Sequence, residues 1–388
     1  MSEYQYYEFL AIDRPLTSRE IEELRAISTR AEITPASFTN VYNWGNFSGD
    51  PDKLMERYFD AHVYMANWMT FIFKLRVPKE ALSKETVRAM GACETIEFRE
   101  TKNHWIVTWR IEESEDYELF EQDSGHGWMA RLAPLRDELI RGDLRGLYIG
   151  WLADISMGIS DEDDMEPIQV NGLGQLTSAQ QALAEFLAVD EDLLAGAGMG
   201  SPAAQGEQAM RKEMEAWIDE LSREEIGAIL KQILSGEGRQ AERAVMNRFA
   251  AWRRDLKDDG DEASRRTVQE LQANARAAEK LRLEKERKEQ VRQEARRRKE
   301  REAYLQKLSG DFPGAWKSIR QTVETGSGSA YEKACQALVD LSEAYSVHAS
   351  KERFQNELRK FMADHLRRRA LVQRLTKAGL WKDGDSKS

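Results

Sequence analysis

Histidine, cysteine, proline and long apolar runs are all scarce in this chain of 388 residues. Its two cysteines, Cys93 and Cys335, lie far apart, which excludes a framework of disulfide bonds and favours a reducing compartment. No run approaches the ~18 apolar residues that a membrane-spanning helix requires. The first residues are acidic where a secretory signal would be basic. We therefore expect a cytoplasmic protein that does not enter a membrane.

Recognisable metal-binding and cofactor-binding motifs are missing too. The five histidines are His62, His104, His126, His348 and His365. No two of them have the spacing of a ligand pair, and neither cysteine belongs to a CxxC motif. The acidic run 161–164 lacks the ordered pattern of a calcium loop, which favours a solvated loop. Residues 171–174 match neither GxGxxG nor a P-loop, so no metal, cofactor or cofactor-binding residue is predicted.

Catalytic residues are equally hard to find. His126 lies in the Ser-Gly-His-Gly stretch 124–127, but no activated serine or cysteine motif accompanies it, which favours a plain surface loop. Cys93 precedes an expected strand and Cys335 lies in an apolar stripe, so both are predicted to be packed thiols. No catalytic residue is predicted. A hydrolase or nuclease-like enzyme in the N-terminal domain, using His126 and nearby carboxylates, is therefore our third hypothesis.

What the chain does have is a division of charge. Residues 263–308 consist mostly of charged residues and alanine, without proline or glycine. From Ala263 to the end there are 29 Lys+Arg and 18 Asp+Glu, a net charge of +11. Residues 1–262 hold 28 basic and 50 acidic residues, a net charge of −22. The chain thus joins an acidic front to a basic back.

Residues 1–158 are predicted to form an α+β domain with a mixed or antiparallel sheet, and they hold 22 of the 34 aromatic residues. Alternating apolar residues, or aromatic and β-branched ones, predict the strands. These strands are expected at 4–11, 38–44, 69–77, 96–99 and 105–111, with a hairpin turn at 101–103. The order of strands and helices favours a sheet covered by helices on one side.

Helix starts are marked by capping residues. Thr17 with Glu20, and Ser222 with Glu225, have the spacing of capping boxes. Asp50 followed by proline is typical of another helix start. That helix is predicted to carry an apolar stripe of Leu54, Tyr58, Ala61 and Met65. Helices are also expected at 131–141 and 144–157.

The rest of the chain is predicted to be helical. The predicted segments are an acidic and glycine-rich linker at 159–175, a helical middle region at 176–257 with a flexible break at 196–202, the long charged helix at 263–308, a small helical domain at 311–380 and a disordered tail at 381–388. This organisation, an α+β domain followed by all-α segments, is the fold class we expect.

The long helix is predicted to be an exposed spacer. It would extend ~69 Å at 1.5 Å per residue. Its first part has a partial apolar seam, formed by Val268, Leu271, Ala275, Ala278 and Leu281. Between 284 and 302 only Val291 and Ala295 are apolar, which is too little for a dimeric coiled coil. Ion pairs four residues apart are expected instead, between Glu284 and Lys288, Arg282 and Glu286, and Glu294 and Arg298.

Two basic clusters keep nucleic-acid binding open as the second hypothesis. Their residues are Arg296, Arg297, Arg298, Lys299 and Arg301, and Arg367, Arg368 and Arg369. Such side chains neutralise phosphates, and neutralising the first cluster should abolish a salt-sensitive interaction. No aromatic residue is interleaved with the first cluster, so base stacking is not indicated there. The alternative interpretation is a solvated helix face.

Several stretches resemble one family. They are the opening YQYYEFLAIDRPLT at 4–17, GLGQLT at 172–177 and the closing RRALVQRLTKAGL at 368–380. With the charged helix, they are similar to a widespread family of uncharacterised bacterial cytoplasmic proteins, over nearly the whole chain. The resemblance implies a shared architecture and a bacterial cytoplasmic location, and it brings no activity, cofactor or catalytic residue with it.

The leading hypothesis is a non-enzymatic adaptor or regulatory protein whose two ends bind different protein partners. It rests on the missing catalytic set and on the stiff spacer between oppositely charged ends. An accessory role in a bacterial defence system would suit this interpretation. Nucleic acid is the alternative partner.

Overall fold

The computed structural model describes residues 4–112, 125–202, 207–257 and 265–381. The chain divides into two compact units, Met1–Leu281 and Arg282–Ser388. The first contains an antiparallel sheet with helices, and the second is helical. The predicted fold class is therefore confirmed. The boundaries predicted for smaller domains within these units stay predictions.

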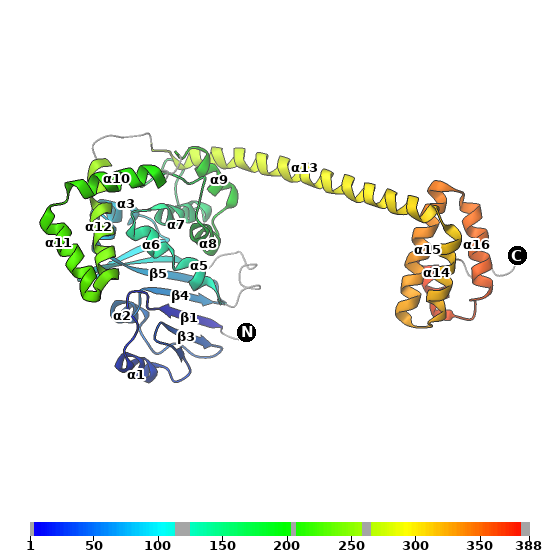
Figure 1. The fold of residues 1–388 in the computed structure, drawn as a ribbon, viewed down its shortest axis with the longest axis horizontal. Helices are drawn as coiled ribbons and strands as arrows, with labels where there is room; N and C mark the ends of the chain where they lie inside the picture. The colour runs from blue at the N-terminus through cyan, green and yellow to red at the C-terminus, as the bar shows by residue number, and fades with distance from the viewer. Residues whose placement is uncertain (1–3, 113–124, 203–206, 258–264, 382–388) are drawn as a thin grey trace. The chain divides into compact units, whose positions relative to one another are not determined.

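The sheet of the N-terminal unit has seven strands (Figure 1). They are β1 (Gln5–Leu10), β2 (Glu32–Ile33), β3 (Ser37–Tyr42), β4 (Ala61–Ala66), β5 (Thr70–Pro78), β6 (Ile96–Glu100) and β7 (His104–Ile111). Their order is β2-β3-β1-β4-β5-β7-β6, and every neighbouring pair is antiparallel. All five predicted strands are present. Thr101 and His104 exchange hydrogen bonds across the predicted hairpin turn between β6 and β7.

Strand β4 is a correction to the sequence analysis. The helix α2 (Pro51–Arg57) begins after its cap Asp50 as predicted, but it ends before Ala61 and Met65. These two residues belong to β4, a central strand in which all six residues are buried. A strand buried on both faces has no polar alternation, so its apolar residues matched a helical spacing by chance.

Helices cover both faces of the sheet, not one face as predicted (Figure 1). On one face, Leu24 of α1 (Ser18–Ile27) and Leu54 of α2 pack into a core with Phe9 and Phe38. The larger core, on the other face, includes the helices that follow β7. These are α5 (Trp128–Leu132), α6 (Leu135–Ile140), α7 (Arg145–Ser156), α8 (Ser178–Phe186) and α9 (Glu191–Met199). Met90 of α3 (Lys84–Met90) joins it.

The flexible break predicted at 196–202 is partly wrong, because helix α9 extends into it. Residues 196–199 are helical, although their glycines predicted a flexible break there. A Cβ on Gly196 would lie 2.5 Å from the backbone nitrogen of Ala275, and a Cβ on Gly198 would lie 3.1 Å from Cα of Gly174. These glycines therefore serve close backbone packing and not chain flexibility.

A buried ion network joins Asp60, the residue before β4, to Arg76 of β5 and Arg136 of α6. Asp60 accepts hydrogen bonds from Nε and Nη2 of Arg76 at 3.2 and 2.7 Å, and from the backbone N–H groups of Ile12 and Asp13 at 2.7 and 2.8 Å. Arg136, whose side chain is 1% exposed, lies 3.6 Å from Asp60 and 2.9 Å from Asp13. Burial alone would raise the pKa of Asp60, but Arg136 and Arg76 outweigh it and hold this pKa below its usual value.

Because of Asp60, the free energy of unfolding should depend on pH in the acidic range. Because its pKa is lower in the folded chain, its contribution is fully present above the unfolded value of about 3.9 and is lost as pH falls through the folded pKa. We expect Asp60→Asn to destabilise the chain at pH 7 and to flatten the loss of stability as pH falls below about 4. Urea midpoints at several pH values measure both effects. An unchanged pH slope would contradict this role.

Helices α10 (Glu207–Glu220), α11 (Arg223–Gln232) and α12 (Gly238–Lys257) form a lobe of the N-terminal unit (Figure 1). Trp217 and Phe249 are buried between α10 and α12. The capping box of Ser222 and Glu225 starts α11 as predicted. No side chain of α11 is buried, and Leu230 of this helix and Ile233, its C-cap residue, are 53% and 47% exposed. An apolar face of α11 therefore meets solvent.

The C-terminal unit packs four helices with the end of the long helix. They are α14 (Phe312–Glu324), α15 (Gly328–His348), α16 (Lys351–Ala363) and α17 (Arg369–Lys377). Its core includes the predicted stripe residues Leu338, Phe361 and Leu371, each fully buried. Leu366, predicted to join them, is 43% exposed because it lies in the turn after α16.

Candidate interaction site along α13

The long helix α13 (Val268–Ser309) is continuous across the boundary of the two units. In the N-terminal unit its first turns are packed into the core, since Val268 and Leu271 are fully buried and Ala278 is 5% exposed. The predicted apolar seam is therefore present, except that Leu281 is exposed. Thr267 caps the helix by accepting a hydrogen bond from the backbone N–H of Glu270.

The acidic run 161–164 also meets the start of α13. The backbone N–H groups of Val268 and Gln269 donate to the carbonyl oxygens of Asp164 and Glu162, at 2.9 and 3.0 Å. Residues 161–164 are exposed, as the solvated-loop interpretation predicted. Negative charge at a helix N-terminus is favourable, because the first N–H groups carry a partial positive charge. The run thus helps to fix where α13 begins.

Arg266, the residue before the cap Thr267, forms a buried ion pair with Glu166. Arg266 donates to Oε1 of Glu166 from Nε and Nη2, at 2.9 and 2.7 Å, and its backbone N–H donates to Oε2 at 2.8 Å. Tyr148 of α7 donates to Glu166 at 2.5 Å, and Nη1 of Arg266 donates to the carbonyl of Ala197 at 2.9 Å. The side chains of Glu166 and Arg266 are only 5% and 18% exposed. This network ties α13 to α7 and α9.

The other end of α13 is fixed within the C-terminal unit. Leu305 is 4% exposed and belongs to that unit's core. Arg301 pairs with Asp340 at 2.7 Å and with Glu343 at 2.5 Å, both on α15. Hydrogen bonds to these carboxylates raise the pKa of Arg301. Tyr304 donates to Asp340 at 3.2 Å. Arg301 was predicted to contact nucleic acid, but in the structure its guanidinium forms ion pairs with Asp340 and Glu343.

Between these ends, every residue from 283 to 300 is exposed. Two of the predicted ion pairs are present, between Arg282 and Glu286 at 3.1 Å and between Lys288 and Glu284 at 2.6 Å. The predicted pair of Glu294 with Arg298 is wrong, because Arg298 turns to Glu302 at 3.3 Å. Such pairs contribute only about 0.2–0.5 kcal/mol each, so they support a solvated helix without neutralising it.

The exposed part of α13 carries a stripe of basic residues on one side. At 3.6 residues per turn, five cations fall within an arc of about 80° around the helix axis. They are Lys285, Lys288, Arg292, Arg296 and Lys299, which we call the basic stripe. Every residue on this arc between 285 and 299 is basic, and the stripe is about 21 Å long.

The contiguous cluster predicted from the sequence is dispersed by the same geometry. Arg296, Arg297, Arg298 and Lys299 point to four sides of the helix, because neighbouring residues are about 100° apart. Only Arg296 and Lys299 belong to the basic stripe. Lys285, Lys288 and Arg292 were not among the predicted contacts, although the helical spacing of their charges is visible in the sequence.

The second predicted cluster, Arg367, Arg368 and Arg369, does not form one exposed basic patch either. Arg368 donates to the carbonyl of Val323 at 2.6 Å and to the hydroxyl of Tyr331 at 3.0 Å, so its role is to join α14 and α15. Arg367 and Arg369 are exposed and form no ion pair with any described residue. Whether any of these side chains contacts nucleic acid stays a prediction.

The other candidates from the sequence lie elsewhere. His126 is exposed, with its ring edge-on to Tyr6 at 4.8 Å between centroids. Cys93 is buried, and burial followed by the nearby charge of Asp154 raises its pKa to about 12, as suits a packed thiol. Burial also raises the pKa of Cys335. Within the described parts of the chain, no group of three or more His, Cys, Asp or Glu residues could hold a metal ion.

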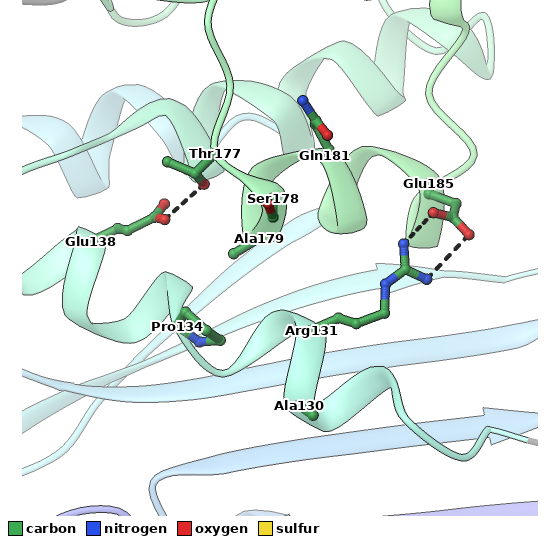
Figure 2. A pocket seen from close by; sticks show the side chains of 9 residues that line it. All are labelled: Ala130, Arg131, Pro134, Glu138, Thr177, Ser178, Ala179, Gln181 and Glu185. Atoms are coloured by element: carbon green, nitrogen blue, oxygen red, sulfur yellow. Dashed lines mark hydrogen bonds and ion pairs between the residues drawn. The ribbon is translucent and has the colours of Figure 1, made fainter.

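One pocket lies between α5, α6 and α8 (Figure 2). Arg131 and Glu185 pair across it, and Glu138 accepts hydrogen bonds from Thr177 and Gln180, each at 2.8 Å. Burial raises the pKa of Glu138, while the hydrogen bond from Thr177 opposes the shift. Both Glu138 oxygens are therefore engaged at the start of α8. His126 does not line this pocket, and the described residues that do include no histidine or cysteine.

No family model, curated protein or solved structure matches this chain. The family resemblance of the opening, middle and closing stretches therefore stays a prediction. Over the described residues, no helix combines the length and apolar character needed to cross a bilayer.

Proposed function

We propose that this protein is a non-enzymatic cytoplasmic adaptor that joins two protein partners, one on each compact unit, through α13. One observation carries the proposal. The two ends of α13 lie in the cores of different units, at Val268 and Leu305, while residues 283–300 between them are all exposed. A solvated helix of this length contributes little to either core, which favours a connecting role.

Charge and surface chemistry support separate partners. Residues 1–281 hold 32 basic and 52 acidic residues, a net charge of −20, and residues 282–388 hold 25 and 16, a net charge of +9. Surfaces of opposite charge attract different partners. The exposed apolar face at the end of α11, with Leu230 in the helix and Ile233 at its C-cap, offers surface that a protein partner with apolar side chains would bury. We assign this face to the partner of the N-terminal unit.

The experiment uses the full chain with a protease site inserted after Gln290, in the exposed part of α13. The tagged chain is purified from its native host, and the captured complex is then cleaved. We expect one partner to leave with each fragment. Recovery of every partner on one fragment, or of no partner at all, would refute the adaptor.

Two matched variants locate the N-terminal partner. Leu230→Gln with Ile233→Gln should remove the partner of the N-terminal unit by more than about tenfold and leave the other partner bound. Glu224→Gln with Lys231→Gln changes the polar side of α11 without changing its net charge, and it should retain both partners. Equal losses in the two variants would exclude the apolar face as the contact.

A further inference from the structure

We propose that the basic stripe of α13 binds the phosphate backbone of duplex DNA. The stripe combines three properties that a backbone contact requires. Its five cations follow one line at steps of three or four residues, or about 4.5–6 Å. All five are exposed, and no acidic residue lies on the same arc. This contact would be additional to the protein partners and does not depend on them.

Phosphates can reach all five cations of the stripe. Lys285, Arg292 and Lys299 form no ion pair with any residue that the structure describes. Lys288 and Arg296 pair with Glu284 and Glu300, but their side chains are 75% and 79% exposed. Exposed pairs of this kind are weak, and a phosphate can replace the glutamate as the partner.

The local charge also favours an anion. Residues 282–309 hold 11 basic and 6 acidic residues, a net charge of +5. All six acidic residues lie outside the arc of the stripe. Glu284 and Glu302 flank it on one side, Glu289 and Glu300 flank it on the other, and Glu286 and Glu294 lie further round the helix. Beyond about 10 Å, other charges are screened at 0.1 M salt. The helix therefore presents one narrow cationic face. If the helix lay deep in a groove of the duplex, the flanking glutamates would come close to phosphates.

Duplex DNA fits this face better than a single strand does. Proteins bind single strands by stacking bases on aromatic residues, and no aromatic residue lies on the arc between 285 and 299. A duplex instead presents a regular row of charge, and about 21 Å of stripe spans roughly six base-pair steps. A contact limited to phosphates positions the chain without reading sequence. We therefore expect binding to any duplex sequence.

The test compares two triple variants of the full chain that lose the same charge from the same helix. The first is Lys285→Gln, Arg292→Gln and Lys299→Gln, which removes the two ends and the middle of the stripe. The matched control is Arg287→Gln, Arg297→Gln and Arg298→Gln, on the arc that also contains Glu294. Glutamine has nearly the helix propensity of lysine and arginine, so α13 should persist, and circular dichroism checks this.

Fluorescence anisotropy with a labelled 30-bp duplex, from 50 to 200 mM salt, gives the readout. With five phosphates neutralised, the wild-type affinity should fall about 500-fold over this range, and that of the stripe variant only about 12-fold. The control should retain the wild-type slope. Three results would overturn the proposal: no duplex binding at 50 mM salt, equal effects of the two triples, or preference for a single strand or for polyglutamate.

Discussion

Replacing Arg266 with methionine is expected to lower the free energy of unfolding of the N-terminal unit by about 3–5 kcal/mol. The substitution leaves Glu166 charged and 5% exposed, with only Tyr148 and a backbone N–H as partners. Removing one member of a buried pair is costly because the other charge stays out of water. At about 2–4 °C per kcal/mol, Tm should fall by at least about 6 °C. Calorimetry of the full chain measures this transition.

The double variant Glu166→Gln with Arg266→Met tests the cause of that loss. It removes both charges, so it should be less destabilising than Arg266→Met alone. If the double variant loses as much as the sum of the two single variants, the buried charge is not the reason. In that case the pair would not explain how the start of α13 is fixed.

The second large effect is expected at Gly196. Replacing it with alanine should destabilise the N-terminal unit by about 1–3 kcal/mol, because the new Cβ would lie 2.5 Å from the backbone nitrogen of Ala275. Backbone cannot move aside as a flexible side chain can, so α9 and α13 would have to separate. Urea denaturation, followed by the fluorescence of buried tryptophans such as Trp109, measures the change.

Gly227 provides the control of opposite sign. It lies inside α11, and a Cβ there would meet nothing within 4 Å. Alanine at an open helical position should therefore stabilise the chain by up to about 1 kcal/mol, since glycine is a poor helix former. If both alanine variants changed stability in the same direction, close packing of α9 on α13 would not be the reason for Gly196.

The sequence predicted most of this fold where local signals agree with the final environment. The capping boxes at Thr17 and Ser222, and the alternating strands β5 and β7, form as expected because side chains close in sequence determine them. Strand β4 was missed because burial on both faces removes alternation. The packing role of Gly196 was missed because it depends on Ala275, which is far along the chain.

The candidate site was predicted only in part, for a similar reason. The charge of α13 is visible in the sequence, but its adjacent basic residues suggested a single patch. Helical geometry separates Arg297 and Arg298 from Lys299 and aligns Lys299 with Lys285. The roles of Arg301 and Arg368 could not be predicted, since their partners, such as Asp340 and Val323, are brought near by tertiary packing.

Hydrogen exchange along α13 distinguishes a solvated helix from one that is packed or unfolded between the two units. Amides of residues 268–278 and 301–309 should exchange slowly, because each segment packs side chains into a core, Val268, Leu271 and Ala278 in one and Leu305 in the other. Amides of 283–300 should exchange much faster than either end, yet more slowly than an unfolded chain, since they belong to a solvated helix. Protection of 283–300 equal to that of the two ends, or no protection at all, would contradict an exposed continuous helix.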